Sequence, residues 1–385
     1  MHRAEIVVDL AAIRHNVGLL KELAAPARLM TVVKADGYGH GMVEVAQVAR
    51  EAGADWLGVA TLDEALSLRA SGDHGPLLCW LTAPGEDYAA GVAADVDLTA
   101  ATEAELDEIA AAGDSVGTVP RVHVKVDTGL RRGGAPRADW HDLFACASDL
   151  HRERRLRVVG LWSHLVAADN PDHPANHAQQ AAFEDALSLA ASAGLEPEVR
   201  HIANSAATLV SPSFRYDLVR CGIATYGLDP APGVTPARLT GSDGLRPAMT
   251  VRASLSLSKP VATGEGVSYG HTWIADHDTT VGLVPAGYAE GIPRAAGNTA
   301  SVWVDGEVRP IRGRVCMDQF MVDLEGDLPP SGTEVVLFGP GDRGEPTAQD
   351  WAVALDTINY EIVTRVGGRL ARHHVDTACA PEERP

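Results

Sequence analysis

The sequence predicts an α/β protein in which a (β/α)8 barrel of the TIM type is followed by a mainly β domain. Three observations support this prediction. Short apolar runs rich in β-branched residues alternate with amphipathic stretches of helical period as far as residue 240. Eight such runs occur, and eight is the number that closes a parallel barrel. Beyond residue 240 the apolar period becomes two, which is typical of half-buried strands.

The eight expected barrel strands are residues 29–33, 56–60, 76–81, 96–99, 121–126, 157–162, 199–202 and 218–220. Helices are expected between them. Asp9 precedes the first amphipathic run and is its expected N-cap. Capping boxes at Thr61–Glu64 and Thr102–Glu105 mark two further helix starts. This regular alternation predicts a barrel domain over residues 1–240.

The remaining residues, 241–385, are expected to form the mainly β domain, and residues 1–8 are candidates to pair with it. The segments 254–258 and 302–308 alternate polar and apolar residues, and the second is broken by an Asp-Gly turn signal. One helix is expected near Trp351–Arg365. Because no Pro/Ser-rich linker separates the two parts, we expect the domains to pack directly.

Composition excludes several classes of function. Asp and Glu outnumber Lys and Arg by 52 to 32, for a formal charge of −20, which disfavours binding to nucleic acids and to anionic membranes. No apolar stretch approaches the ~18 residues of a membrane span, and the N-terminus lacks the apolar core of a signal peptide. The five cysteines never show CxxC spacing, so no zinc site is indicated. We expect a cytoplasmic protein with free thiols.

Charged and polar side chains follow the expected strands at their carboxyl ends, the face on which barrel enzymes carry their active sites. They are Lys34 after the first strand, Lys125 and Asp127 after the fifth, His164 after the sixth, Asn204 and Ser205 after the seventh, and Arg220 at the eighth. By chance these groups would be spread over both ends of the barrel. The sequence therefore predicts an active site at one rim.

Lys34 is the most informative of only four lysines. An isolated lysine at a strand end more often extends its amine into solvent. Lys34, however, follows an apolar strand, where desolvation lowers the pKa of an amine and favours the nucleophilic form. A Gly-rich turn follows at once and allows a ligand to approach closely. These features point to a Schiff base with a carbonyl cofactor.

The segments after the seventh and eighth strands resemble an anion-binding corner. Asn204 and Ser205 offer side-chain and backbone donors, and Gly222 and Ile223 offer backbone amides at a turn. Each pair alone would be read as a helix cap or a plain turn. At adjacent strand ends they predict a site for a phosphorylated ligand, because barrel enzymes often hold phosphate in this corner.

Nine motifs, in order along nearly the whole chain, resemble those of bacterial alanine racemases, which are fold-type III enzymes that use pyridoxal 5′-phosphate (PLP). The motifs are VVKADGYGHG (32–41), KVDTGLRRGG (125–134), WSHLVAAD (162–169), HIANSAATL (201–209), RCGIATYG (220–227), GVSYGHTW (266–273), GYAEGIPR (287–294), GRVCMDQFMVD (313–323) and NYEIVTR (359–365). The resemblance implies a homodimeric, PLP-dependent racemase that interconverts L- and D-alanine, with active sites shared between subunits and D-alanine supplied for peptidoglycan.

The resemblance also implies roles for the reacting residues. Lys34 is similar to the lysine that carries PLP and serves as the base for the D-enantiomer, and Tyr269 is similar to the opposite base. Arg132 resembles the arginine that holds the substrate carboxylate and the phenolic oxygen of the cofactor. The backbone of Met317 matches a substrate contact, and Lys125 matches a lysine that is carbamylated in many members.

The remaining implied roles concern the cofactor. Arg220 resembles the arginine that faces the pyridine nitrogen, and His164 resembles the histidine that links Tyr269 towards it. The residues that match phosphate contacts are Tyr38, Asn204, Ser205, Gly222, Ile223 and Tyr360. The chain departs from the family at Cys221, where a proline is usual, and in the C-terminal RLARHHV (369–375), which lacks a common aromatic residue.

Three alternatives remain open at this point. Racemases of serine or of other small amino acids share most of these motifs. A PLP-dependent decarboxylase of the same fold type is disfavoured, because such enzymes carry an Asp four residues after a C-terminal Cys, whereas Cys316 is followed by Met317 and Asp318. A non-enzymatic PLP-binding protein built from the barrel alone is disfavoured by the whole region 240–385.

Overall fold

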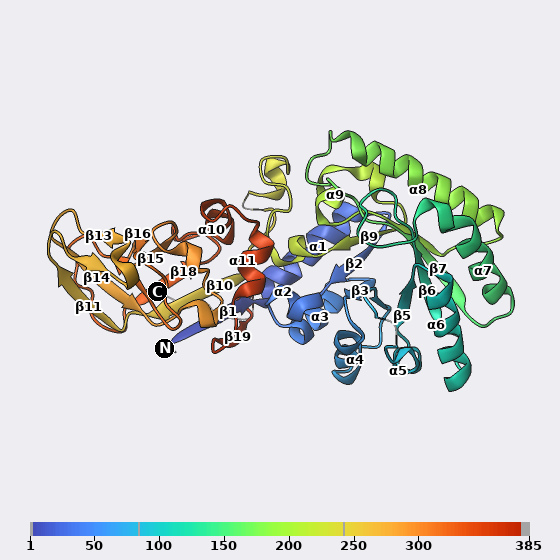
Figure 1. Cartoon of the computed structure of the whole chain (residues 1–385), viewed down its shortest axis with the longest axis horizontal. Coiled ribbons are helices and arrows are strands. Elements are labelled where there is room, and N and C mark those ends of the chain that lie inside the picture. Colours follow the sequence, from blue (N-terminus) through green and yellow to red (C-terminus); the bar gives the residue numbers. More distant parts are fainter. Residues whose placement is uncertain (1–2, 84, 242, 379–385) are drawn as a thin grey trace. The chain divides into compact units, whose positions relative to one another are not determined.

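The computed structural model describes residues 3–83, 85–241 and 243–378 (Figure 1). Contacts divide the chain into two compact units. Unit 1 comprises Met1–Ala12, Tyr38–Gly41 and Arg246–Pro385, and unit 2 comprises Ile13–Gly37 and Met42–Leu245. Cys379 lies outside the described residues. None of the helices in the described part of the chain is both long and apolar enough to cross a membrane.

Unit 2 is built on an eight-stranded parallel sheet in the order β8-β7-β6-β5-β4-β3-β2-β9. Its strands are β2 (Arg28–Val32), β3 (Trp56–Val59), β4 (Leu77–Cys79), β5 (Asp97–Ala100), β6 (Arg121–Lys125), β7 (Arg157–Trp162), β8 (Val199–His201) and β9 (Leu218–Cys221). Each expected strand is present, and the barrel prediction is confirmed. The seam between β8 and β9 has no regular ladder, but Asp217 N–H donates to the Arg200 carbonyl (3.1 Å) and Arg220 N–H to that of Ala203 (3.0 Å).

Helices alternate with these strands and lie outside them, as Figure 1 shows for α6, α7 and α8. They are α1 (Leu10–Ala24), α3 (Met42–Glu51), α4 (Leu62–Ala70), α5 (Tyr88–Ala93), α6 (Glu103–Val116), α7 (Trp140–Arg152), α8 (Pro174–Ser192) and α9 (Ser205–Val210). Both predicted capping boxes form, at Thr61 and at Thr102. Asp9 accepts from the N–H of Ala11 (2.9 Å), as expected of an N-cap.

A hydrophobic cluster packs among the barrel strands, and all five of its buried members come from strands. They are Met30, Trp56, Leu78, Val199 and Leu218. Trp80, partly buried, packs against them. The interior of the barrel is therefore a packed core, and ligands can reach only its rims.

Unit 1 contains a nine-stranded sheet that includes the first strand of the chain. β1 (Ala4–Asp9) pairs antiparallel with β10 (Met249–Ser254) and parallel with β19 (Ala371–Val375), which contains most of the RLARHHV segment. The other strands of unit 1 are β11 (Leu257–Val261), β12 (Gly266–Val267), β13 (Trp273–Ile274), β14 (Thr279–Val284), β15 (Ser301–Val304), β16 (Glu307–Arg312), β17 (Phe320–Asp323) and β18 (Glu334–Phe338). The predicted Asp-Gly turn joins β15 to β16, with positive φ at Asp305 (50°) and Gly306 (94°).

Two details of the sequence prediction for this region are wrong. The segment 254–258 is not one strand: β10 ends at Ser254, β11 begins at Leu257, and Leu255 between them is buried. The helix expected near 351–365 is two helices, α10 (Ala348–Ala354) and α11 (Asn359–Arg365). Asp356 between them has φ of 54°, a left-handed conformation that ends a helix.

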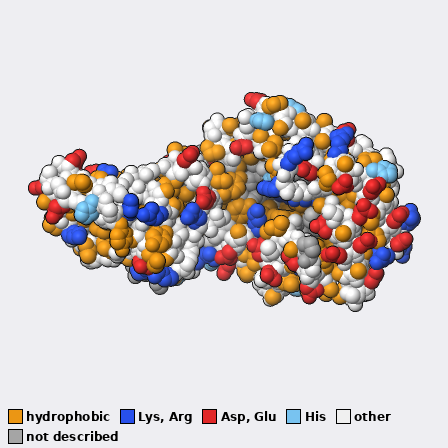
Figure 2. Space-filling view, viewed as in Figure 1, with side chains coloured by type: hydrophobic (Ala, Val, Ile, Leu, Met, Phe, Trp, Pro, Cys, Tyr) orange, Lys and Arg blue, Asp and Glu red, His pale blue; other side chains and the backbone are white. Residues whose placement is uncertain are grey.

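Charged side chains on the surface are mixed in sign. On the face in view, Figure 2 shows Asp and Glu interspersed with Lys and Arg over unit 2. Over unit 2, the described residues on this face form no extended area of Lys and Arg alone (Figure 2).

Candidate active site

Lys34 lies directly after β2, at the carboxyl end of the barrel, in the segment labelled α2 (Lys34–Tyr38). This segment is a left-handed turn, with φ of 52° at Ala35, 52° at Asp36 and 62° at Gly37. For a non-glycine residue this conformation costs roughly 1–2 kcal/mol. Such strain persists only where the surroundings impose it, and it is concentrated at functional sites.

Hydrogen bonds that involve side chains help to hold the turn. The N–H of Ala35 donates to Glu64 Oε1 (2.6 Å), and Asp36 Oδ1 accepts from the N–H of Met42 (3.0 Å). Glu64 thus has two tasks, because its Oε2 also accepts from the N–H of Thr61 (3.2 Å) in the capping box of α4. Sequence reasoning assigned Glu64 only the second task.

Burial lowers the pKa of the Lys34 amine, the positive charge of Arg132 lowers it further, and Glu64 opposes the shift. A larger fraction of the amine is therefore neutral at physiological pH than for an ordinary lysine. A neutral amine can attack a carbonyl and can accept a proton from carbon. The lowered pKa of the amine is the property on which the sequence-based hypothesis for Lys34 depends.

Lys125 ends β6, and its Nζ lies 4.4 Å from the ring centroid of Trp162 at the end of β7. Burial lowers the pKa of Lys125 to about 8, with further contributions from Arg220 and Arg132. The guanidinium of Arg220 also lies over the Trp162 ring, at 4.8 Å. The indole of Trp162 therefore makes cation–π contacts with two cations of the site. Sequence reasoning missed Trp162, which gave no signal beyond its place in a quoted motif.

Arg220 is buried in β9 and directs its N–H groups only to uncharged acceptors. Nη2 donates to the carbonyls of Ser163 (2.9 Å) and Ile202 (3.2 Å) and to Nδ1 of His164 (3.1 Å). Nη1 donates to Nδ1 of His201 (3.2 Å). Burial lowers the pKa of Arg220 to about 9, so the guanidinium stays mostly protonated at neutral pH.

Burial and the surrounding cations, with Arg220 first among them, lower the pKa of His164 well below its usual value. The ring is therefore neutral at physiological pH. Because Arg220 can only donate, His164 accepts at Nδ1 and must carry its proton on Nε2. This leaves one N–H donor of His164 for another partner.

The four residues of the predicted phosphate corner lie together. Asn204 caps α9 by accepting from the N–H of Ala207 (3.0 Å). The buried Oγ of Ser205 accepts from the N–H of Gly222 (2.9 Å). Ile223 begins the 3-10 turn Ile223–Tyr226 directly after Gly222. The side chain of Ser205 thus joins the loop after β8 to the loop after β9. Hydroxyl and backbone N–H groups of this kind can donate to an anion.

The remaining predicted residues belong to unit 1. Tyr38 and Tyr360 have ring centroids 6.3 Å apart. Tyr269 follows β12 in the short turn Tyr269–His271, and its side chain is 71% exposed. Met317 is 54% exposed. Lys34 belongs to unit 2, so the two proposed bases lie in different units.

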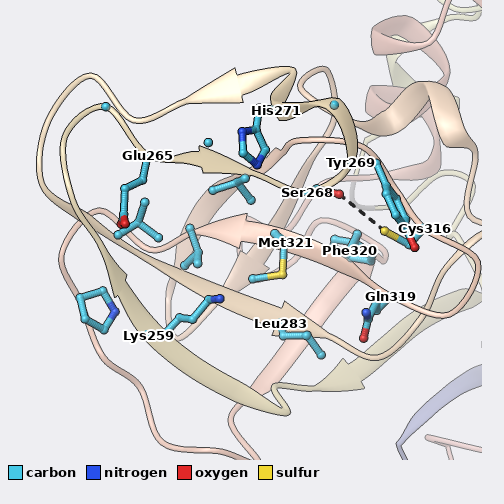
Figure 3. Close-up of a pocket in the computed structure, with 17 residues that line it drawn as sticks. Lys259, Glu265, Ser268, Tyr269, His271, Leu283, Cys316, Gln319, Phe320 and Met321 are labelled. Atoms are coloured by element: carbon cyan, nitrogen blue, oxygen red, sulfur yellow. Dashed lines mark hydrogen bonds between the residues drawn. The ribbon is translucent and has the colours of Figure 1, made fainter.

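Tyr269 stands at the edge of a cavity of about 900 Å³ within unit 1 (Figure 3). Figure 3 shows Ser268, Tyr269 and Cys316 close together at one end of this cavity. Ser268 Oγ donates to the carbonyl of Arg314 (2.7 Å) and lies 3.5 Å from Cys316 Sγ. The loop that carries Tyr269 is thus tied to the segment that continues into Met317.

The cationic groups of unit 2 fit an anionic cofactor such as PLP. The charge of Arg132 lowers the pKa of Lys34, Lys125 and Arg220, so all four cations lie within electrostatic reach. Among the described residues none of the four forms an ion pair with a carboxylate. Uncompensated cations in a partly buried rim require anions, and a phosphate, a phenolic oxygen and a substrate carboxylate would supply them. No cluster of metal-ligating side chains occurs among residues 3–83, 85–241 and 243–378.

Comparison with known proteins identifies the family of this chain. Residues 8–230 match the family model "Alanine racemase, N-terminal domain", and residues 248–374 match "Alanine racemase, C-terminal domain". A protein named alanine racemase from Frankia casuarinae is 53% identical over 373 residues, covering 97% of this chain and 96% of that protein. The chain belongs to the alanine racemase family. The match to the C-terminal domain also argues against the alternative built from the barrel alone.

Solved structures of family members agree in fold. An alanine racemase from a D-cycloserine-producing Streptomyces lavendulae superposes with a TM-score of 0.94 at 49% identity, over 97% of both chains. An alanine racemase from Bacillus anthracis with bound L-Ala-P superposes with a TM-score of 0.89 at 34% identity, over 98% of this chain and 96% of that chain. The fold class predicted from the sequence is confirmed.

Sequence reasoning missed three buried polar residues behind Arg220, namely Asp97, His123 and His201. His201 opens the quoted motif HIANSAATL but received no role. His123 stands inside the apolar run of the fifth expected strand and Asp97 near the start of the fourth. A polar residue within a buried strand was the available signal, because such groups are rarely buried without a partner.

Proposed function

We propose that this member of the alanine racemase family is a PLP-dependent isomerase that interconverts L- and D-alanine with two bases, Lys34 and Tyr269. The observation that carries the proposal is the group of uncompensated cations at the carboxyl rim of the barrel, in which the amine of Lys34 has a lowered pKa. In this proposal residues 1–240 supply Lys34 and most of the cofactor contacts, and residues 241–385 supply Tyr269, Met317 and Tyr360. The enzyme class and the cofactor agree with the full-length relatives.

Racemisation requires removal of a proton from one face of Cα and delivery of another to the opposite face. PLP, when bound, withdraws electrons from Cα and makes its proton acidic. Lys34 would carry the cofactor between turnovers, and its Nζ, freed as a neutral amine when the amino group of the substrate takes its place on the cofactor, would accept or return the proton on the D side. The phenolic oxygen of Tyr269 does the same on the L side. Arg132 orients the substrate by pairing with its carboxylate, and the backbone of Met317 lines the same position.

Arg220 and His164 control charge around the reacting atoms. Arg220 stays protonated and can only donate, so it leaves the ring nitrogen of the cofactor as an acceptor without a proton. This limits how strongly the cofactor withdraws electrons and so disfavours transamination. We assign the Nε2–H donor of His164 to the phenolic oxygen of Tyr269.

The phosphate group of the cofactor is assigned to six residues. Ser205, Gly222 and Ile223 contribute at the joined loops after β8 and β9, next to the Asn204 cap. Tyr38 and Tyr360 contribute phenolic O–H donors. Lys125 is proposed to be carbamylated, because its lowered pKa makes more of the amine neutral than in an ordinary lysine, and the resulting negative charge would pair with Arg132.

A second subunit completes the site. Tyr269 is 71% exposed and Met317 is 54% exposed within their own chain, which is unusual for side chains with catalytic tasks. In the proposed two-fold homodimer, the partner subunit's Tyr269 and the partner subunit's Met317 reach the barrel that holds Lys34. A cytoplasmic location and supply of D-alanine for peptidoglycan follow from the family resemblance.

The deciding experiment is a chiral assay of purified protein with PLP against a panel of L-amino acids. Equimolar L- and D-alanine should form from either enantiomer, faster than any other amino acid is racemised. Faster racemisation of serine would replace the substrate assignment. Loss of the carboxyl group as CO2 would favour the decarboxylase alternative.

A further inference from the structure

A continuous line of hydrogen bonds runs through the interior of the barrel behind Arg220. Arg220 Nη1 meets His201 Nδ1 at 3.2 Å, and His201 Nε2 meets His123 Nδ1 at 2.9 Å. His123 Nε2 then meets Asp97 Oδ2 at 3.2 Å. Both imidazole rings are fully buried, and Asp97 is 2% exposed. The line crosses from the amino-terminal end of β5 to the rim that carries Lys34.

The direction of every bond in this line is fixed by its first member. A guanidinium only donates, so His201 must accept at Nδ1. A neutral His201 therefore has its proton on Nε2 and donates to Nδ1 of His123. His123 in turn has its proton on Nε2 and donates to the carboxylate of Asp97. Burial and the charge of Arg220 lower the pKa of His201 well below its usual value, which keeps that ring neutral.

At the far end of the line, the carboxylate of Asp97 accepts hydrogen bonds from two further side chains. Arg121 Nε donates to Asp97 Oδ1 (2.6 Å), and the indole N–H of Trp56 donates to Oδ2 (3.2 Å). Burial raises the pKa of Asp97, but His123 and, after it, Arg121 lower it to about 2. Asp97 is therefore a carboxylate at physiological pH. Arg220 is thus separated from the nearest negative charge in the line by two imidazole rings.

The backbone is shaped around His123. The pairing of β6 with β7 shifts register between Val122 and His123, which marks a bulge in the ladder. Opposite this point β7 carries Gly160, and a Cβ there would overlap the His123 ring. Trp162 stacks on His201 at 5.5 Å with an interplanar angle of 2°. The bulge and the glycine thus make room for the ring of His123.

We propose that Asp97 and His123 are positioning residues that act through His201 to hold the guanidinium of Arg220 in one orientation with its positive charge uncompensated. This inference rests on the proposed function, because it gives the line a task only if Arg220 faces the ring nitrogen of the cofactor. A carboxylate placed directly on Arg220 would neutralise the guanidinium. Two neutral imidazoles fix the guanidinium without doing so.

The first test needs no cofactor. Long-range 15N–1H spectra of apoprotein with 15N-labelled histidine report which ring nitrogen carries the proton. Asp97→Asn, His123→Gln and His201→Asn provide the assignments. His123 and His201 should both be neutral with the proton on Nε2. A proton on Nδ1 of either ring, or a doubly protonated ring, would overturn the proposed direction.

The second test separates positioning from packing. Asp97 accepts from Arg121 at Oδ1 and from Trp56 and His123 at Oδ2, so the amide of Asp97→Asn must turn its NH2 towards at least one donor, and in either orientation the negative charge that ends the line is lost. Trp56→Phe is the matched control: it removes one donor to the same carboxylate but leaves the imidazoles in place. The readout is the rate at which pyridoxamine 5′-phosphate accumulates during turnover, divided by the racemisation rate.

Asp97→Asn should raise this ratio by about tenfold, the equivalent of one net buried hydrogen bond, whereas Trp56→Phe should leave it near the wild-type value. Equal ratios in the two variants would overturn the positioning role. If wild-type protein with PLP does not racemise alanine, the proposed function fails, and the spectra of the apoprotein still decide the direction of the line.

Discussion

The Nζ of Lys125 lies 4.4 Å from the centre of the Trp162 ring, over the face of the indole. An indole face attracts a cation but offers no hydrogen-bond acceptor, so it keeps Lys125 in place without an ion pair. Burial and the neighbouring arginines then lower its pKa to about 8. The indole thus fixes the position of the Lys125 amine, and its lowered pKa lets the amine lose its proton more readily than an ordinary lysine does.

The first prediction is that Lys125 is carbamylated. A carbamate forms only on a neutral amine, and its negative charge would replace repulsion from Arg132 by attraction. Protein equilibrated with 13C-bicarbonate should show a carbamate carbon signal that is lost in Lys125→Arg and retained in Lys259→Arg. A signal that survives in Lys125→Arg, or an unmodified Lys125 in a well-resolved crystal structure grown with bicarbonate, would refute this.

The second prediction concerns the pH dependence of stability. Folded Lys125 loses its proton near pH 8, whereas the unfolded chain keeps it to about pH 10.4. Between these values the unfolded state binds more protons, so the free energy of unfolding rises with pH. In CO2-free buffer without PLP, Lys125→Met should therefore be more stable than wild type at pH 7, by at most on the order of 3 kcal/mol. This gain should disappear by pH 10.5.

Urea unfolding at intervals from pH 7 to pH 10.5 measures this difference. Lys259→Met is the matched control, because Lys259 is exposed and its removal should leave the pH dependence unchanged. Parallel stability curves for Lys125→Met and wild type would show that the pKa of Lys125 is not lowered in the folded protein.

The third prediction is that Lys34 carries PLP. Borohydride reduction followed by peptide mapping should place the pyridoxyl group on Lys34. Lys34→Ala should lose the label and reduce kcat by at least about 10²–10⁴-fold, the range for loss of a general base. Lys259→Ala should retain both label and activity. A pyridoxyl group on Lys125 or Lys259 in the wild-type protein contradicts the assignment.

The fourth prediction is a preference for alanine over 2-aminobutyrate. Tyr269, Tyr360 and Met317 are proposed to close over the substrate and to leave room for a methyl group. One extra methylene in a tight pocket lowers kcat/KM by roughly 10–200-fold. A chiral assay of both amino acids measures this ratio, and equal kcat/KM values would show that the pocket is not closed in this way.

Sequence patterns predicted the barrel and the rim residues because both depend on local features. Lys34 and Lys125 end apolar strands, and parallel strands bring their carboxyl ends to one rim. The Gly-rich turn after Lys34 was predicted, but its left-handed conformation at Ala35 and Asp36 was not, because positive φ is uncommon for non-glycine residues.

The line from Asp97 to Arg220 could not be predicted for a different reason. Its four residues lie on four strands, and contact between them depends on the register of β6 against β7, which the bulge at His123 shifts. Sequence gives strands but not bulges of this kind. The break between β10 and β11 was missed likewise, because alternation of Ser and Leu continues through it.

The central claim is that Lys34 and the partner subunit's Tyr269 act on one substrate molecule, and a mixing experiment tests it most directly. Lys34→Ala and Tyr269→Ala proteins, each inactive alone, are dissociated, mixed in equal amounts and reassembled. Random pairing makes about half of the dimers mixed, and each mixed dimer has one intact site and one site that lacks both bases. About one quarter of the wild-type activity should therefore return. If mixed dimers are shown to form and no activity returns, the shared two-base site is wrong.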